Sequence, residues 1–257
     1  MNTAGHQQIT AAIGAARQQG RTALVGFLTA GFPDKEGFAG NLQAVASACD
    51  VVEIGVPFTD PMADGTTIQR ASFAALKAGV SLSWIIAQLR TLAPRPKTPV
   101  LLMSYLNPLL AYGLARLPRD AAAAGIAGFI VPDLPFEESG DLKTALAGEG
   151  LALIQMVSPV TPPERLGKLC AGAQGFIYAV TMTGTTGKAA VVPADVLAYM
   201  DRVRKMAAIP VCAGFGIRTR EQVALFGAHV DGVVVGSALI EVLERGEDPR
   251  AFLASLR

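Results

Sequence analysis

Eight short apolar runs, most of them rich in β-branched residues, recur along this chain and alternate with longer segments that fit a helix. Most runs are almost continuously apolar and lack the two-residue alternation of a half-exposed strand, which is typical of parallel strands covered on both faces. They span residues 22–30, 50–58, 99–105, 128–133, 151–158, 175–181, 210–216 and 232–239. The helix-compatible segments include residues 36–48, 67–79, 137–150, 162–173, 194–207 and 219–228.

This alternation predicts an α/β fold, a single (β/α)8 TIM barrel with an extra N-terminal helix. A length of 257 residues suits one such barrel, and no Pro/Ser-rich linker marks a boundary. We therefore expect residues 1–257 to form a single domain. An open doubly wound sheet is the alternative architecture. In a barrel, functional residues lie where the strands end and the following loops begin.

Composition narrows the class of protein. The 22 basic and 21 acidic residues give a net charge of +1, and no Lys/Arg tract suggests a nucleic-acid or membrane partner. No apolar run approaches the roughly 18 residues that span a bilayer, and the N-terminal residues lack the order of a signal peptide. Cys49, Cys170 and Cys212 show no metal-ligand spacing, which favours reduced, buried thiols. We expect a cytoplasmic protein that acts on a small molecule.

An acidic side chain interrupts the second apolar run. The two-residue period of a strand directs Val52, Ile54 and Val56 to one face and Glu53 to the other. Because the branched side chains suit the helix-facing side, we expect Glu53 to point into the barrel mouth. Desolvation there would raise its pKa, so that the carboxyl could donate a proton near neutral pH. The alternative is a core ion pair, which would need a matching cation.

Two more acids, Asp60 and Asp64, follow in a loop rich in Pro and Gly. Either could form an Asx-type turn or cap the helix that follows, and for Asp60 this interpretation is favoured. Asp64 could instead reach into the mouth opposite Glu53, where paired carboxylates can divide the roles of acid and stabiliser.

Small-residue turns follow the last two strands, at residues 213–222 and 234–243. Each is expected to run straight into a helix, where the bare backbone at Gly216 and Gly236 and the hydroxyl of Ser237 would make a phosphate site. Loops after strands seven and eight commonly bind phosphate in this fold. A Gly/Thr-rich segment at residues 181–192 suits a loop that closes over a ligand, or a disordered connector.

The residue inventory excludes several kinds of chemistry. His6 and His229 are the two histidines, and neither ends a predicted strand, so a histidine-based metal site or hydrolase is disfavoured. All the lysines fall outside the strand runs, which argues against a Schiff base. No GxGxxG follows a strand. Carboxylate acid-base chemistry on a phosphorylated substrate remains, with neither metal nor cofactor.

Residues 53–65, EIGVPFTDPMADG, resemble the ELGVPFSDPLADG motif of the tryptophan synthase alpha chain family. The resemblance continues through FLTAGFP, MSYLNPLLAYG, VPDLPFEES, FIYAV with TGTTG, GFGIRTREQ and VVGSALI, over nearly the whole chain. It implies a carbon-carbon lyase that cleaves indole-3-glycerol phosphate by a retro-aldol step into indole and glyceraldehyde 3-phosphate. It also implies a tryptophan synthase beta chain as partner in an alpha2-beta2 tetramer. Pyridoxal phosphate is expected only in that partner, and no cofactor in this chain.

The resemblance also implies residue roles. Glu53 would donate a proton to indole C3 and later accept the hydroxyl proton, and Asp64 would hold the indole N–H. Tyr178 would belong to the catalytic pocket, although an ordinary core aromatic is an equal alternative. The other implied positions are Phe27, Ile68 and Tyr105 around the indole, Gly187, Phe215, Gly216, Gly236 and Ser237 on the phosphate, and Asp60 and Thr186 in loop closure and signalling.

Two segments depart from the family pattern. Thr66 stands where proline is usual, and the segment after the sixth strand reads VTMTGTTGKA. There are two alternatives: a stand-alone lyase that releases free indole, and a non-catalytic barrel that activates a beta chain. The presence of both Glu53 and Asp64 argues against the non-catalytic barrel. A sugar-phosphate isomerase or epimerase is disfavoured by the scarcity of histidine.

Overall fold

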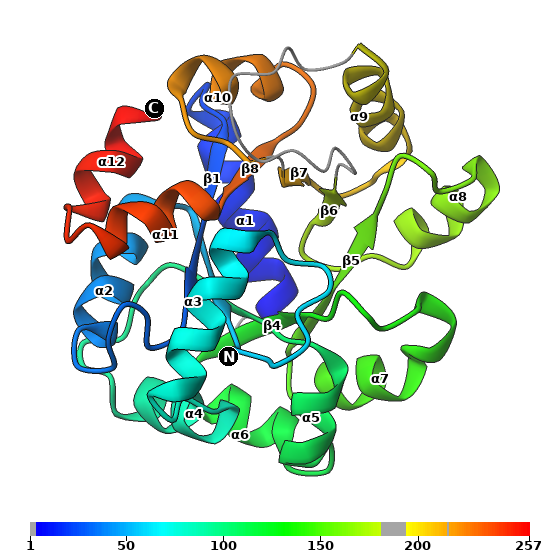
Figure 1. Ribbon diagram of the computed structural model, residues 1–257. Helices are drawn as coiled ribbons and strands as arrows, with labels where there is room; N and C mark the ends of the chain where they lie inside the picture. The colour runs from blue at the N-terminus through cyan, green and yellow to red at the C-terminus, as the bar shows by residue number, and fades with distance from the viewer. Residues whose placement is uncertain (1–3, 181–193, 215) are drawn as a thin grey trace.

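The computed structural model describes residues 4–180, 194–214 and 216–257, in which eight parallel strands form a closed barrel in chain order (Figure 1). The strands are β1 (Ala23–Thr29), β2 (Val51–Gly55), β3 (Val100–Met103), β4 (Ile126–Ile130), β5 (Ala152–Val157), β6 (Ile177–Val180), β7 (Val211–Gly214) and β8 (Gly232–Val235). β1 pairs with β8 from Ala23↔Gly232 to Gly26↔Val235, which closes the ring. The predicted barrel is confirmed, and the open sheet is wrong. That the chain is one domain stays a prediction.

All eight strands differ from their predicted limits, and two of the differences have a clear cause. β4 begins at Ile126, two residues earlier than expected, and ends before Pro132, which has no N–H to donate to a ladder. β8 ends at Val235, because Ser237 already begins a helix.

Twelve α-helices and one 3-10 helix surround the barrel in the part of the chain described. They are α1 (Gly5–Gln18), α2 (Phe38–Ala48), α3 (Thr66–Lys77), α4 (Leu82–Thr91), α5 (Leu106–Tyr112), α6 (Leu117–Ala123), η1 (Phe136–Glu138), α7 (Gly140–Gly148), α8 (Pro163–Ala171), α9 (Ala194–Met206), α10 (Arg220–Gly227), α11 (Ser237–Glu244) and α12 (Pro249–Ser255). Helices α4, α5, α6 and α12 were not predicted from the sequence. The last three have only seven residues each, too few for a clear helical period.

Alternate strand residues enter two separate buried layers. Val51 and Phe27 belong to a cluster inside the barrel, whereas Val52 and Ile54 belong to the layer between the strands and the helices. Glu53, between Val52 and Ile54, therefore faces the barrel interior, as predicted.

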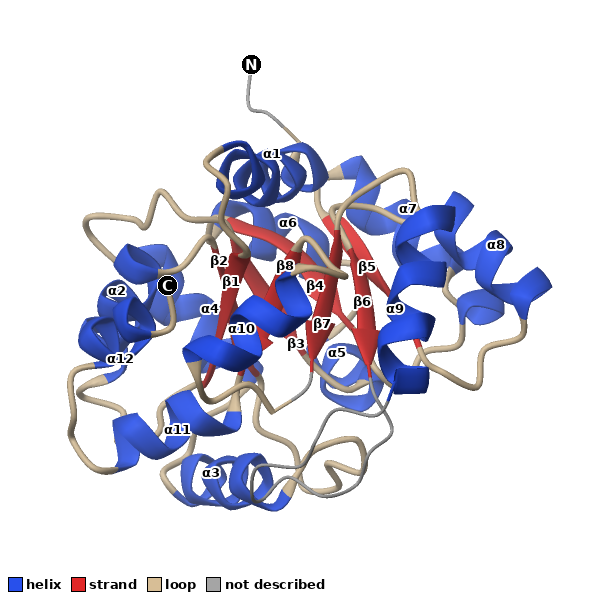
Figure 2. Cartoon of the chain, turned by 90° about the horizontal axis from the view of Figure 1, so that it is seen from above, coloured by secondary structure: helices blue, strands red, loops and turns tan. Residues whose placement is uncertain are grey.

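Helix α1 covers the end of the barrel at which the strands begin, as Figure 2 shows, with α3 and α11 at the opposite end. Its residues Ile9 and Ile13 are fully buried with the interior cluster. Gly5 N donates to Gly150 O at 2.6 Å, and Thr10 Oγ1 donates to Gly175 O at 2.7 Å. The predicted N-terminal helix is confirmed, and it leaves the carboxyl ends of the strands as the end where a cavity can open.

Two further sequence expectations concern thiols and membranes. Cys49, Cys170 and Cys212 are buried and free, as predicted. In the described ranges, no single helix is long and apolar enough to cross a bilayer, although α3 and α4, bent by 83°, pass as a pair on length and composition.

Candidate active site

A cavity of about 900 Å³ opens at the carboxyl ends of the strands. It brings together side chains and glycines that are far apart in the sequence and that the sequence analysis singled out. These are Phe27, Glu53, Asp64, Ile68, Tyr178, Gly216, Gly236 and Ser237. The cavity is therefore shared by the acids after β2 and the turns after β7 and β8.

Glu53 lies in the middle of β2 with none of its side chain exposed. Neither carboxyl oxygen has a hydrogen-bond partner among the described residues, so the alternative of a core ion pair is not supported. Burial raises the pKa of Glu53 to about 8, and the nearby carboxyl of Asp64 adds to the rise. The carboxyl is therefore mainly protonated at neutral pH and is able to act as an acid.

Asp64 lies in the loop between β2 and α3, next to Gly65, the N-cap of α3. No side chain caps this helix, so the N-cap interpretation of Asp64 is wrong. Its Oδ2 instead accepts a hydrogen bond from the Tyr105 hydroxyl at 3.2 Å. Burial raises the pKa of Asp64 to about 6, and the Tyr105 hydrogen bond opposes this rise. Asp64 is therefore mainly anionic at neutral pH.

Tyr105 is the N-cap residue of α5, and its hydroxyl also accepts a hydrogen bond from Ala63 N at 2.9 Å. Its ring stacks on Phe58, with 5.2 Å between the ring centroids. Tyr105 is not among the residues that line the cavity. Its expected contact with an indole ring stays a prediction, whereas its contact with the Asp64 loop is a finding.

A glutamine holds the same loop and was missed by the sequence analysis. Gln69, on α3, donates from Nε2 to the carbonyl of Asp64 at 2.9 Å and lines the cavity. A glutamine in an amphipathic helix is normally exposed to solvent, so the sequence pattern did not indicate that Gln69 belongs to the site.

Tyr178 lies on β6 and is buried against Phe176, with 6.0 Å between the ring centroids. A Cβ at Gly214, on the neighbouring strand, would come within 2.6 Å of the Tyr178 ring, so only glycine fits there. The strand pairing Tyr178↔Cys212 thus places the ring over a bare backbone. Burial raises the pKa of Tyr178 well above its ordinary value, which keeps its hydroxyl protonated at neutral pH.

The two glycine turns differ from each other. Gly236 is the N-cap of α11, no side chain caps this helix, and Ser237 is its first residue. Gly216 has a positive φ of 61° and precedes α10 by the residues 217–219. The side chain of Thr219 caps α10 by accepting from Gln222 N. The helix predicted at residues 219–228 is therefore confirmed as α10, but Gly216 does not lie at its start as expected, whereas Gly236 does lie at the start of α11.

The remaining predicted residues lie outside the cavity or outside the described residues. The carboxylate of Asp60 is exposed and accepts a hydrogen bond from Thr59 Oγ1 at 2.5 Å. Thr186, Gly187 and Phe215 fall outside the described residues, as does the expected closing segment at residues 181–192.

The arrangement combines an acid, an anion and the N-terminus of helix α11 in one cavity. Glu53 can give up a proton while Asp64 stabilises a developing positive charge, because their pKa values differ although both are carboxyls. In residues 4–180, 194–214 and 216–257, no group of three or more His, Cys, Asp or Glu side chains could hold a metal ion.

The family model described as "Tryptophan synthase alpha chain" matches residues 13–256. The chain is 45% identical to the tryptophan synthase alpha chain of Solidesulfovibrio magneticus, over 97% of this chain and 98% of that protein. It is also 45% identical to the alpha chain of Roseiflexus castenholzii, over 93% and 92% of the two chains. A structure of Mycobacterium tuberculosis tryptophan synthase is similar, with a TM-score of 0.88, 35% identity and 96% of both chains covered. With the barrel and the paired acids, these matches show that the chain belongs to the tryptophan synthase alpha chain family.

Proposed function

We propose that this chain is a lyase of tryptophan synthesis that cleaves indole-3-glycerol phosphate into indole and glyceraldehyde 3-phosphate. The observation that carries the proposal is the fully buried carboxyl of Glu53, which faces the same cavity as Asp64 and has no hydrogen-bond partner in the part of the chain that the structure describes. A buried carboxyl without a partner costs stability, and a proton-transfer role explains its presence.

The proposed reaction breaks the bond between indole C3 and the first carbon of the glycerol phosphate chain. Glu53 donates a proton to C3, and the Asp64 carboxylate accepts a hydrogen bond from the indole N–H and balances the positive charge of the indoleninium. When the bond breaks, its electron pair returns to the ring. The side-chain hydroxyl gives its proton to the Glu53 carboxylate and becomes the aldehyde, so that the protons balance and no redox partner is needed.

Substrate binding in this proposal uses the other walls of the cavity. Phe27, Ile68 and Tyr178 supply apolar surface for a flat ring. The first turn of α11, with Ser237 and the Gly216 turn beside it, would bind the phosphate. Thr186, Gly187 and Phe215 enter the proposal through the family resemblance alone.

We also propose a tryptophan synthase beta chain as the partner, in an alpha2-beta2 tetramer located in the cytoplasm. Met62, in the loop between Asp60 and Asp64, is 83% exposed, and Leu110, on α5, is 49% exposed. Both residues follow the carboxyl ends of strands, β2 and β3, and exposed apolar side chains on this side of the barrel favour a protein partner there. Pyridoxal phosphate belongs to the beta chain in this proposal.

The test is indole release from indole-3-glycerol phosphate by the purified chain, with and without a beta chain. We expect slow release by the chain alone and faster release with the partner. Equal, fast release under both conditions would favour a stand-alone lyase. No indole under either condition, from folded protein, would favour a non-catalytic barrel.

A further inference from the structure

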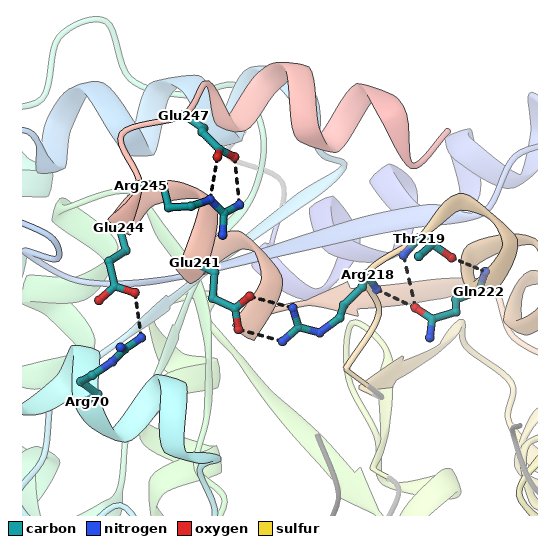
Figure 3. A network of polar contacts seen from close by, with 8 residues as sticks. All are labelled: Arg70, Arg218, Thr219, Gln222, Glu241, Glu244, Arg245 and Glu247. Carbon is teal, nitrogen blue, oxygen red and sulfur yellow. Dashed lines mark hydrogen bonds and ion pairs between the residues drawn. The ribbon is translucent and has the colours of Figure 1, made fainter. Parts of the chain in front are cut away.

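A two-point ion pair joins the turn after β7 to helix α11, which follows β8. Arg218 Nη1 donates to Glu241 Oε2 at 2.7 Å, and Arg218 Nη2 donates to Glu241 Oε1 at 2.8 Å. Figure 3 shows Arg218 reaching from the turn to α11. Because Gly216 lies two residues before Arg218 and Gly236 is the N-cap of α11, the pair bridges the two segments of the proposed phosphate site.

Among the described residues, the pairing between β7 and β8 ends at Gly214↔Val234, before the Gly216 turn and α11. Side-chain contacts can therefore help to set the spacing between the turn and the helix, and the Arg218–Glu241 pair is a contact of this kind.

The Arg218 end of the pair is fixed by its own turn. Arg218 N donates to Gln222 Oε1 at 2.7 Å, and Thr219 and Gln222 form a reciprocal capping box at the start of α10. Figure 3 shows these contacts next to the ion pair. The guanidinium therefore extends from an ordered backbone.

Helix α11 is also connected to the acid side of the cavity. Arg70 Nη2, on α3, donates to Glu244 Oε2, at the C-terminal end of α11, at 2.7 Å. Because α3 begins directly after the Asp64 loop, α11 is tied to both halves of the proposed site.

The geometry of the pair indicates positioning more than stability. Its side chains are 37% and 28% exposed, and partly exposed ion pairs contribute little to the free energy of unfolding. A two-point Arg–carboxylate contact does fix the relative orientation of the segments that carry it. The hydrogen bonds from Arg218 lower the pKa of Glu241, which keeps the carboxylate ionised at neutral pH.

We propose that Arg218 and Glu241 are positioning residues that hold the Gly216 turn and the α11 N-terminus at the spacing needed to bind the phosphate group of the substrate. The inference rests on the proposed function, in that it takes this end of the cavity as the phosphate site.

The test is isothermal titration of the full chain with glycerol 3-phosphate and, separately, with indole. Arg218→Met and Glu241→Met should each raise the Kd for glycerol 3-phosphate about fivefold, and the double variant should be no worse than either. Arg218→Lys keeps the charge but loses the two-point contact, so it should bind as weakly as Arg218→Met. The Kd for indole should not change, since indole carries no phosphate.

The matched control is Arg245→Met, which removes another two-point pair, with Glu247, at the exposed C-terminal end of α11. We expect it to bind glycerol 3-phosphate like the wild type. Wild-type affinity in Glu241→Met would overturn the inference, because Arg218 would then contact the phosphate directly. Wild-type affinity in Arg218→Lys would overturn it as well, because the charge alone would be sufficient. Equal weakening in the Arg245→Met control would also contradict it. Wild-type protein that binds glycerol 3-phosphate but releases no indole would overturn the proposed reaction and leave this inference standing.

Discussion

The two carboxyl groups of the cavity lie in regions of different construction. Glu53 is on a strand that is paired on both sides, with Phe27 on β1 and Leu101 on β3 as its register partners. Asp64 is in a loop, where Tyr105 and Gln69 hold it by hydrogen bonds to its side chain and backbone. Glu53 is fully buried and has no hydrogen-bond partner within the described ranges, whereas Asp64 is half-buried and hydrogen-bonded.

This difference explains how one chemical group can take two roles. Burial, together with the nearby Asp64 carboxyl, brings the pKa of Glu53 to about 8, while the Tyr105 hydrogen bond restrains the pKa of Asp64, which rises only to about 6. Between these values Glu53 holds its proton and Asp64 has lost its own. The strand thus supplies an acid and the loop an anion, and each variant below changes one side of this pair.

The largest effect is expected from Glu53→Gln. The glutamine amide has the same shape as the carboxyl but no acidic proton to transfer to C3, so kcat for indole release should fall about 1,000-fold. Titration with glycerol 3-phosphate should give an unchanged Kd, because the substitution lies away from the phosphate end. Glu149→Gln, at an exposed acid after α7, is the matched control and should keep full activity. Substantial turnover by Glu53→Gln would remove Glu53 from proton transfer.

Asp64→Asn should lower kcat about 100-fold, since the amide still hydrogen-bonds but carries no charge to balance the indoleninium. In this variant kcat should no longer fall as the pH is lowered through about 6, because the carboxyl that titrates near this pH has been removed. Asp60→Asn, in the same loop but exposed, should have a smaller effect. A variant of Asp64 with normal kcat would show that the anion is not needed.

Tyr105→Phe tests the restraint on Asp64. Because the lost hydrogen bond lowers the pKa of Asp64, its removal should raise that pKa and move the acid limb of kcat/KM to higher pH. At mildly acidic pH we expect roughly fivefold lower kcat/KM. The control is Tyr112→Phe, which removes a hydroxyl bonded to Asp120 at 2.9 Å at the other end of α5. An unmoved acid limb would show that Tyr105 does not act through Asp64.

The smallest effect is expected from Thr66→Pro, at the junction of the Asp64 loop and α3. Thr66 is the first residue of the helix, where proline fits, and Gly65 before it has φ −74° and ψ 163°, which proline permits. The free energy of unfolding should rise by about 0.5 kcal/mol, measured by chemical denaturation. A fall instead would mean that the Thr66 N–H has a partner that proline removes.

The strand pattern was sufficient to predict the barrel and the direction of Glu53, because both follow from a two-residue period in an apolar run. It could also be predicted from the sequence that Glu53 and Asp64 face the same cavity, since the loop that carries Asp64 begins where the Glu53 strand ends. The burial of Glu53 without any cation could only be anticipated from the scarcity of basic residues in the strands.

Contacts made by residues far apart in the sequence were not predictable. The Tyr105 hydroxyl reaches Asp64 across 41 positions, and Arg218 reaches Glu241 from a different strand's turn. The sequence around a tyrosine or an arginine does not indicate which distant residue it will contact. The start of α10 was predicted at the correct residue, Thr219, but the capping box that Thr219 forms with Gln222 was not.

The most direct test is a carbon-13 NMR titration of the glutamate carboxyls, with the Glu53 signal identified by its loss in Glu53→Gln and indole release measured over the same pH range. We predict that Glu53 titrates near pH 8 and that indole release falls with the same midpoint as the pH rises through it. A midpoint near 4.5, the ordinary value for glutamate, or release that continues unchanged through the titration, would contradict the account.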